Sequence, residues 1–237
     1  MSTPITAVGG GPILAVSFDV DGTLYRPSFK LFWRALTLGA FRPLRLQKPA
    51  RDATRGRTFP DGDTLRREVA REMGNRAGMQ QSEAEALMEH VRTRIIPPLL
   101  RGAASRDATE ALTRLKQGGV RTAAFSDLDT ASKIAALGFP SGLFDVVIAA
   151  EDAGAYKPGA PAFALLAQRL GVPAATILHV GDRADTDAAG ALSAGMVAAV
   201  LYPAEAPRGA LQVSSLRELA DRVLLGRATA PAQLPAA

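Results

Sequence analysis

The chain has 237 residues, of which 47% are hydrophobic, so it is long enough to bury the core of one large domain and a modest second module. It contains no cysteine, which excludes a disulfide framework, a zinc–thiolate site and a thiol nucleophile. The net charge of +5 is uneven, because residues 26–104 carry a net +8 and the remainder a net −3. Since there is no cysteine, any nucleophile must be an oxygen or nitrogen group. The charge count shows that the basic residues are concentrated in one segment.

The two ends of the chain are rich in Gly, Pro and Ala, so we expect residues 1–11 and 227–237 to be disordered tails. Residues 1–11 lack the basic start and apolar run of a secretory signal. No stretch approaches the ~18 uninterrupted apolar residues of a membrane span. These features predict a cytoplasmic location.

A short apolar run at residues 13–18 predicts the first strand, and no strand pattern follows over residues 26–102. Within this insert, residues 63–73 predict a short helix that ends near Gly74. Ser82 with Glu85 predicts the start of a second helix, which Pro97–Pro98 would stop. Apolar residues would lie together on one face of that helix: Ala84, Leu87, Met88, Val91 and Ile95. The insert is therefore expected to be an all-helical cap over residues 26–102.

From Gly102 onward, short apolar runs alternate with helical segments, which is the pattern of parallel α/β units. Four further strands are predicted, at residues 120–125, 146–149, 177–180 and 197–201. Asp107 with Glu110 predicts the start of one helix, and Ser215 with Glu218 the start of the last. The expected fold class is α/β, with a Rossmann-like parallel sheet formed by residues 12–25 and 103–226.

Polar side chains follow four of these strands, where ligands of open parallel sheets bind. They are Asp19 and Asp21; Ser126 and Asp127; Glu151, Asp152 and then Lys157; and Asp182, Asp185 and Asp187. Converging carboxylates repel one another unless a cation joins them, and a site of oxygen ligands suits Mg²⁺. The sequence therefore predicts a magnesium site at this edge of the sheet.

Four ordered motifs in the chain resemble those of the haloacid dehalogenase-like (HAD-like) hydrolase superfamily. They are Phe-Asp-Val-Asp-Gly-Thr-Leu at 18–24, Phe-Ser-Asp at 125–127, Tyr-Lys-Pro at 156–158 and Gly-Asp-Arg-Ala-Asp-Thr-Asp at 181–187. The resemblance covers about residues 13–203, with the helical insert where that family places its cap after the first motif. It implies the phosphatase branch, which hydrolyses phosphate monoesters with Mg²⁺ through an aspartyl-phosphate intermediate.

The resemblance also implies roles for the acidic residues. Asp19 is the nucleophile, and Asp21 protonates the leaving oxygen and later deprotonates water. The implied metal ligands are Asp19, the backbone carbonyl of Asp21, and Asp182. Asp187 matches a position that orients the residues around the metal.

The implied phosphate-binding residues are Ser126, Asp127 through its backbone amide, and Lys157. Two positions depart from the family pattern. Asp127 stands where asparagine is commoner, which adds negative charge near the phosphate, and Arg183 stands where a small hydroxyl residue is common. His179 lies inside an apolar strand and is expected to pack in the core.

The predicted activity is hydrolysis of a small phosphorylated metabolite, with phosphoglycolate as a typical substrate of such capped relatives. The alternatives are a phosphomutase of the same fold and a non-catalytic binding or regulatory protein. A haloacid dehalogenase is disfavoured, because those relatives need neither Asp21 nor a metal.

The basic charge of the insert invites a nucleic-acid or membrane interpretation, with Phe29, Phe32 and Trp33 as apolar contacts. We favour a solvated helix face whose long basic side chains lie over its own hydrophobic core. On this view no nucleic-acid partner is expected, and contact with a membrane surface is disfavoured. Part of the basic stripe could attract an anionic substrate.

Overall fold

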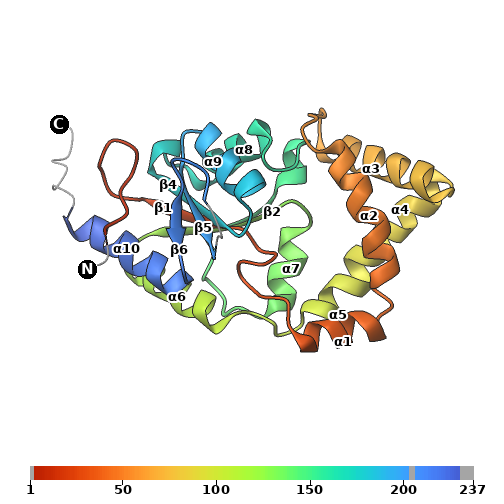
Figure 1. Ribbon diagram of the computed structural model, residues 1–237, viewed down its shortest axis with the longest axis horizontal. Coiled ribbons are helices and arrows are strands. Elements are labelled where there is room, and N and C mark those ends of the chain that lie inside the picture. Colours follow the sequence, from red (N-terminus) through yellow and green to blue (C-terminus); the bar gives the residue numbers. More distant parts are fainter. Residues whose placement is uncertain (1–2, 203–205, 230–237) are drawn as a thin grey trace.

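The computed structural model describes residues 3–202 and 206–229, and its centre is a sheet of six parallel strands (Figure 1). The strands are β1 (Ala15–Phe18), β2 (Arg121–Ser126), β3 (Val146–Ala149), β4 (Ile177–Gly181), β5 (Val197–Leu201) and β6 (Leu211–Val213). Their spatial order is β3-β2-β1-β4-β5-β6, so the direction of winding reverses between β1 and β4. The predicted Rossmann-like α/β fold is confirmed.

Helices cover both faces of the sheet (Figure 1). One face packs on α6 (Arg106–Gln117), α7 (Thr130–Leu137) and α10 (Leu216–Thr229), and the other on α8 (Ala160–Leu170) and α9 (Ala189–Ser193). Alternate strand residues serve the two layers, so that Phe18 lies in the first cluster and Phe125 in the second. Short helical turns are η2 (Ala150–Ala153), η3 (Ala174–Thr176) and η4 (Ala184–Ala188).

The five predicted strands are all present, with ends that differ by no more than two residues from the prediction. The sixth strand, β6, was not predicted. It has three residues, lies at the edge of the sheet beside β5, and includes the exposed Gln212. A run this short carries no readable alternation of apolar and polar residues.

The insert between β1 and β2 is the predicted helical cap (Figure 1). It consists of α1 (Phe29–Thr37), α2 (Phe41–Thr54), α3 (Gly62–Ala77), α4 (Gln81–His90), the π-helical turn η1 (Val91–Ile95) and α5 (Ile96–Leu100). Its main apolar cluster is buried between α2, α3 and α4 and includes Leu65, Met73 and Ala84. A second cluster joins α1 to η1 through Ala35, Val91 and Ile95.

Three predicted helix ends in the cap are wrong. The capping residues of α4 are Gln80 and Glu83, because the Gln80 N–H donates to Glu83 Oε2 at 2.9 Å, two residues before the predicted Ser82–Glu85 pair. Pro97–Pro98 do not stop a helix but begin α5, where the first turn needs no N–H donors. The helix α3 runs through Gly74 to the left-handed Gly78, where no side chain opposes a positive φ.

The N-terminal segment also differs from the predicted disordered tail. Ile5 and Ala7 are buried in the core beside α10. The Ile5 N–H donates to the Arg222 carbonyl at 2.9 Å, and the Val8 N–H donates to the Ala175 carbonyl at 3.0 Å. At the other end α10 continues to Thr229, whereas residues 1–2 and 230–237 lie outside the described residues.

The outer face of α1 carries exposed aromatic rings. Phe29, Phe32 and Trp33 are 76%, 51% and 49% exposed, and the Trp33 ring contacts each of the two phenylalanine rings edge-on. These three rings therefore lie outside the hydrophobic clusters of the cap, and the favoured view that the long basic side chains lie over its core stays a prediction. Within residues 3–202 and 206–229, the structure contains no helix with the length and hydropathy needed to traverse a bilayer.

Asp107 connects the two helices that cover the same face of the sheet. The residue that caps α6 is Ser105, not Asp107 as predicted. The Asp107 carboxylate instead accepts the N–H groups of Leu216 at 2.8 Å and Arg217 at 3.2 Å, at the start of α10. It thus satisfies backbone donors that α10 itself leaves open.

Asp107→Ala is expected to lower the free energy of unfolding by about 1.5 kcal/mol, because two amide donors lose a charged acceptor. This corresponds to a fall in Tm of roughly 3–6 °C, measured by calorimetry. Asp221→Ala serves as the control, since its partner Arg114 and Asp221 are both about half exposed and such a pair contributes little. Equal stability of the two variants would contradict this assignment.

Candidate active site

The predicted site residues meet at the carboxyl ends of β1, β2 and β4, beside the point where the strand order reverses. Asp19 directly follows β1 and is 6% exposed. Its N–H donates to the Val180 carbonyl of β4 at 2.8 Å, so the backbone of the loop is fixed to the neighbouring strand.

Lys157 joins two of these carboxylates. Its Nζ donates to Asp19 Oδ1 and to Asp187 Oδ1, each at 2.6 Å, and the lysine is 3% exposed. Burial alone would lower the pKa of Lys157, but Asp187 and Asp19 hold it well above its usual range. The lysine therefore stays charged at the side of Asp19.

The Asp187 carboxylate contacts three groups, of which Lys157 is the first. Its Oδ1 also contacts His179 Nε2 at 3.4 Å, and its Oδ2 accepts the Arg183 N–H at 3.2 Å. Burial alone would raise the pKa of Asp187, but Lys157 and His179 lower it well below its usual range. His179 lies in the core as predicted, and burial lowers its pKa, so it is neutral at neutral pH.

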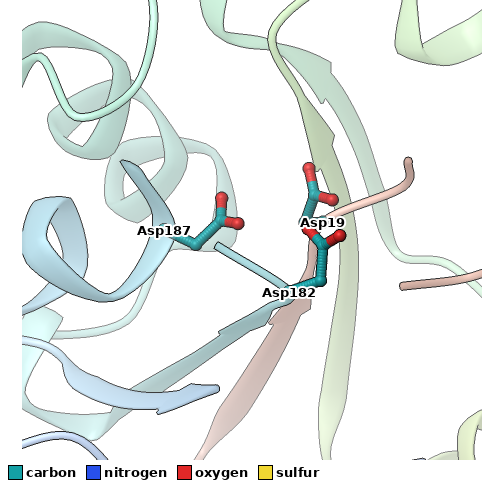
Figure 2. A group of neighbouring side chains, drawn as sticks. All are labelled: Asp19, Asp182 and Asp187. Atoms are coloured by element: carbon teal, nitrogen blue, oxygen red, sulfur yellow. The ribbon is translucent and has the colours of Figure 1, made fainter. Parts of the chain in front are cut away.

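Three carboxylates form a cluster suited to a cation (Figure 2). Oxygens of Asp19, Asp182 and Asp187 lie within 4.8 Å of one another. Burial raises the pKa of Asp19 to about 8 against the effect of Lys157, and burial followed by the charge of Asp187 also raises the pKa of Asp182. A hard divalent cation would relieve this repulsion, and a set of oxygen ligands is what Mg²⁺ takes. The cluster thus fits Mg²⁺ and includes Asp187 beside the predicted Asp19 and Asp182.

Asp21 lies on the solvent side of this cluster, with its side chain 47% exposed. Its Oδ1 accepts the Tyr25 hydroxyl at 2.6 Å, and its Oδ2 accepts the Ser126 hydroxyl at 3.1 Å and contacts Lys133 Nζ. Partial burial alone would raise the pKa of Asp21, but Lys133 and these hydrogen bonds lower it to about 2. Asp21 is therefore ionised at neutral pH in this arrangement.

The Asp127 carboxylate pairs with the backbone of Lys157 and with a side chain of the cap. Its Oδ1 accepts the Lys157 N–H at 2.9 Å, and its Oδ2 accepts Arg55 of the cap at 2.8 Å. The extra charge at this departure from the family pattern is thus neutralised by Arg55. At the second departure, Arg183 donates to both oxygens of Asp185 at 3.0 and 2.6 Å near the surface.

Two glycines give the carboxylates room. A Cβ on Gly22, where φ is +90°, would lie 2.2 Å from Asp182 Oδ2. A Cβ on Gly181 would lie 2.2 Å from Asp187 Oδ2. Real side chains do not approach this closely, so both positions need glycine for the acidic cluster to form.

Three further residues contact the predicted site residues although none lies in a predicted motif: Tyr25, Lys133 and Arg55. Lys133 lies on α7, is 6% exposed and donates to Ser126 Oγ at 3.0 Å. A lysine on the helix that follows a strand ending in a predicted phosphate-binding serine is a sequence signal for such a contact. Arg55 offered no such signal, because it is one of many basic residues in the cap.

A cavity of about 660 Å³ opens from Asp21 toward the cap. Its walls include basic, acidic and apolar residues from both domains, among them Arg51, Arg66, Met88, Arg92, Leu128, Asp129 and Glu151. The Glu151 carboxylate is 3.8 Å from Arg66, and Asp129 is 4.0 Å from Arg92, so these cap arginines are only loosely paired across the cavity. The volume lies in the range of cavities that bind small molecules.

A family model described as haloacid dehalogenase-like hydrolase matches residues 13–195. The chain belongs to this family. The match to the haloacid dehalogenase-like hydrolases covers most of the sheet and the whole cap, and it confirms the resemblance that the four motifs carry. It assigns the broad class of hydrolase.

Over 60 residues, this HAD-like hydrolase is 42% identical to the 5-amino-6-(5-phospho-D-ribitylamino)uracil phosphatase YigB of Escherichia coli (strain K12). That match spans a quarter of each protein. Magnesium-bound YfnB of Bacillus subtilis has a TM-score of 0.64 and 15% identity, over 90% of this chain and 99% of that one. A 2-haloacid dehalogenase of Pseudomonas syringae pv. Tomato DC3000 has a TM-score of 0.61 and 22% identity, over 92% and 100%. At these identities the two solved structures show the shared fold alone.

Mg²⁺ is expected to stabilise the protein more at pH 8 than at pH 6. The raised pKa of Asp19 means that its ionisation in the metal-free fold costs stability as the pH rises toward 8, and Mg²⁺ offsets this cost. At a free concentration 100 times Kd the gain is about 2.7 kcal/mol, or roughly 5–10 °C in Tm. Thermal unfolding with and without Mg²⁺ at both pH values measures it. Asp182→Asn should abolish the response, and an equal gain at pH 6 would contradict the expectation.

Gly22→Ala is expected to abolish the Mg²⁺-dependent gain in Tm, because the new Cβ would displace the Asp182 carboxylate. Gly39→Ala is the matched control, since Gly39 also has a positive φ but has open space around it. Calorimetry with and without Mg²⁺ compares the two variants. A full response in Gly22→Ala would show that the close approach is dispensable.

Proposed function

We propose that this protein is a Mg²⁺-dependent phosphate monoester hydrolase that works through an aspartyl-phosphate on Asp19. The observation that carries the proposal is the pairing of a buried Asp19 with Lys157 at 2.6 Å, with Asp21 two residues further along the same loop. This arrangement supplies a nucleophile, a fixed positive charge and a proton-transfer group within one site.

In the first half-reaction a carboxylate oxygen of Asp19 attacks phosphorus and the P–O bond to the leaving group breaks. The leaving oxygen takes a proton from Asp21. In the second half-reaction Asp21 accepts a proton from water, whose oxygen attacks the phosphorus and releases orthophosphate and the free Asp19 carboxylate. Each cycle therefore returns both aspartates to their starting states.

The pairing of Asp21 with Lys133 bears on these two proton transfers. The lowered pKa keeps Asp21 ionised, which prepares it to accept a proton from water. To protonate a leaving group, Asp21 must first gain a proton, and weaker contact with Lys133 would raise its pKa toward this role. A bound phosphoryl group offers Lys133 and Ser126 an alternative anionic partner.

Fixed positive groups stabilise the charge that spreads over the phosphoryl oxygens. Lys157 and Ser126 are the candidate donors, and loss of one such donor costs about 3 kcal/mol in comparable sites. Bound by Asp19 and Asp182, Mg²⁺ would supply further charge neutralisation at the phosphoryl group.

Asp21 favours phosphate chemistry over dehalogenation, because a dehalogenation leaves a halide that needs no proton. The local identity to YigB, a phosphatase by name, supports the same choice over its 60 residues. The magnesium in the YfnB structure is consistent with a cation in this fold.

The cavity favours a leaving group larger than that of phosphoglycolate. Its volume of about 660 Å³ exceeds what a two-carbon acid fills, and its lining mixes both charges with apolar side chains. A phosphorylated sugar, polyol or nucleoside-sized alcohol would match this lining better. The ribityl phosphate in the name of YigB is one compound of this kind.

Phosphate release from a panel of sugar, polyol and nucleoside phosphates, phosphoglycolate and an aryl phosphate tests the proposal. We expect Mg²⁺-dependent release that Asp19→Asn lowers by at least about a thousandfold, because the nucleophile is lost. Asp185→Asn is the control, since Asp185 lies near the surface and pairs with Arg183.

Each alternative has its own result in this assay. With a 2-haloacid added to the panel, release of halide without phosphate release would establish a dehalogenase. Conversion of a sugar phosphate to its isomer without phosphate release would establish a mutase. Neither product from any compound would leave the non-catalytic alternative and overturn the proposal.

A further inference from the structure

We propose that the cap keeps Lys157 in position against Asp19. Arg55 is the positioning residue by which the cap does this. This inference rests on the proposed function and adds a role for a cap side chain that does not touch the substrate. It is drawn from three kinds of contact between the cap and residues 151–157.

The first contact is polar. Arg55 lies at the end of α2. One of its guanidinium N–H groups donates to Asp127 Oδ2 at 2.8 Å, and another donates to the Lys157 carbonyl. The same Asp127 side chain accepts the Lys157 N–H at 2.9 Å. Both backbone groups of Lys157 are thus held in one network that contains a cap residue. The side chains of Arg55 and Asp127 are only 15% and 13% exposed, so solvent screens their ion pair less than it would a pair at the surface.

The second contact is apolar. Tyr156 immediately precedes Lys157 in the core sequence, yet its side chain is 1% exposed and belongs to the main apolar cluster of the cap. It packs there with residues such as Leu65 and Met73. The cap therefore contains a side chain next to the lysine as part of its own core.

The third contact is between backbones that lie too close for side chains. The Phe59 N–H donates to the Gly154 carbonyl at 2.8 Å. A Cβ on Gly154 would lie 2.1 Å from the Phe59 carbonyl oxygen, and one on Gly62 would lie 2.7 Å from the Glu151 carbonyl oxygen. The cap thus fits against this segment with no space for a lateral shift.

These contacts all converge on the segment whose last residue supplies the charge at Asp19. If the cap moved away, the Lys157 carbonyl and the Asp127 carboxylate would lose Arg55, and Tyr156 would lose its apolar surroundings. The position of Lys157 Nζ would then be fixed by fewer contacts. Closure of the cap and alignment of the lysine are therefore one event.

The same geometry explains the acidic residue at position 127. An asparagine could accept the Lys157 N–H, but it would leave the partly buried guanidinium of Arg55 with the more distant carboxylate of Asp52, at 3.8 Å, in place of the one at 2.8 Å. Aspartate serves both groups at once, since its two oxygens face different donors. The departure from the family pattern is thus matched by a residue of the cap.

Arg55→Met tests the proposal by steady-state kinetics on an aryl phosphate. We expect kcat to fall about tenfold to a hundredfold while KM changes less than about threefold, because a misplaced catalytic group slows the chemistry. The kcat of Arg55→Lys should lie between those of Arg55→Met and the unaltered protein, since one ammonium reaches one of the two acceptors. Arg57→Met is the matched control, because Arg57 pairs with Glu68 within the cap at 2.8 Å.

Hydrogen exchange followed by mass spectrometry gives a readout that does not need turnover. In Arg55→Met, peptides over residues 151–158 should exchange faster than in the unaltered protein, whereas Arg57→Met should leave them unchanged. Faster exchange together with the selective loss of kcat supports the proposal. Unchanged exchange, or an equal loss of kcat in Arg57→Met, overturns it. If no phosphatase activity is found at all, the exchange result still decides whether Arg55 fixes this segment.

Discussion

Lys157 carries its charge into a site that is almost closed to solvent, between the carboxylates of Asp19 and Asp187. A buried ammonium is stable only when it is paired, so this lysine requires both acids, and both acids require it. Gly181 has to lack a side chain so that Asp187 can reach the lysine. His179, on β4, contacts the Asp187 carboxylate and helps to fix it. Much of the local sequence of the site follows from keeping one charge in place.

The sheet could be predicted from sequence because each of its main strands is a short apolar run bounded by turns. Because both faces of such a strand are covered, nearly all of its residues are apolar, and the run can be recognised in the sequence. Helix ends in the cap were harder, because several polar residues near Gln80 can act as caps and only packing selects one. The burial of Ile5 could not be foreseen for the same reason, since its partner surface is formed by α10, at the other end of the sequence.

The acidic residues of the site were predictable because parallel strands end at one edge and bring their following residues together. Residues that reach the site from elsewhere were not. Lys133 enters from a helix and Arg55 from the cap, and neither position is fixed by the period of a strand. The exposure of the Phe29 and Trp33 rings could not be predicted either. Their helical spacing is the same whether that face of the helix is buried or exposed.

The ion pair between Arg55 and Asp127 joins two segments that are 72 residues apart in sequence. Helical caps and α/β cores are easily regarded as interchangeable modules, but in this protein each supplies one partner of a partly buried ion pair. A cap grafted from a relative without a basic residue at this place would leave the Asp127 carboxylate without the guanidinium that pairs with it. Transplanting the cap therefore requires either carrying Arg55 with it or returning position 127 to a neutral amide.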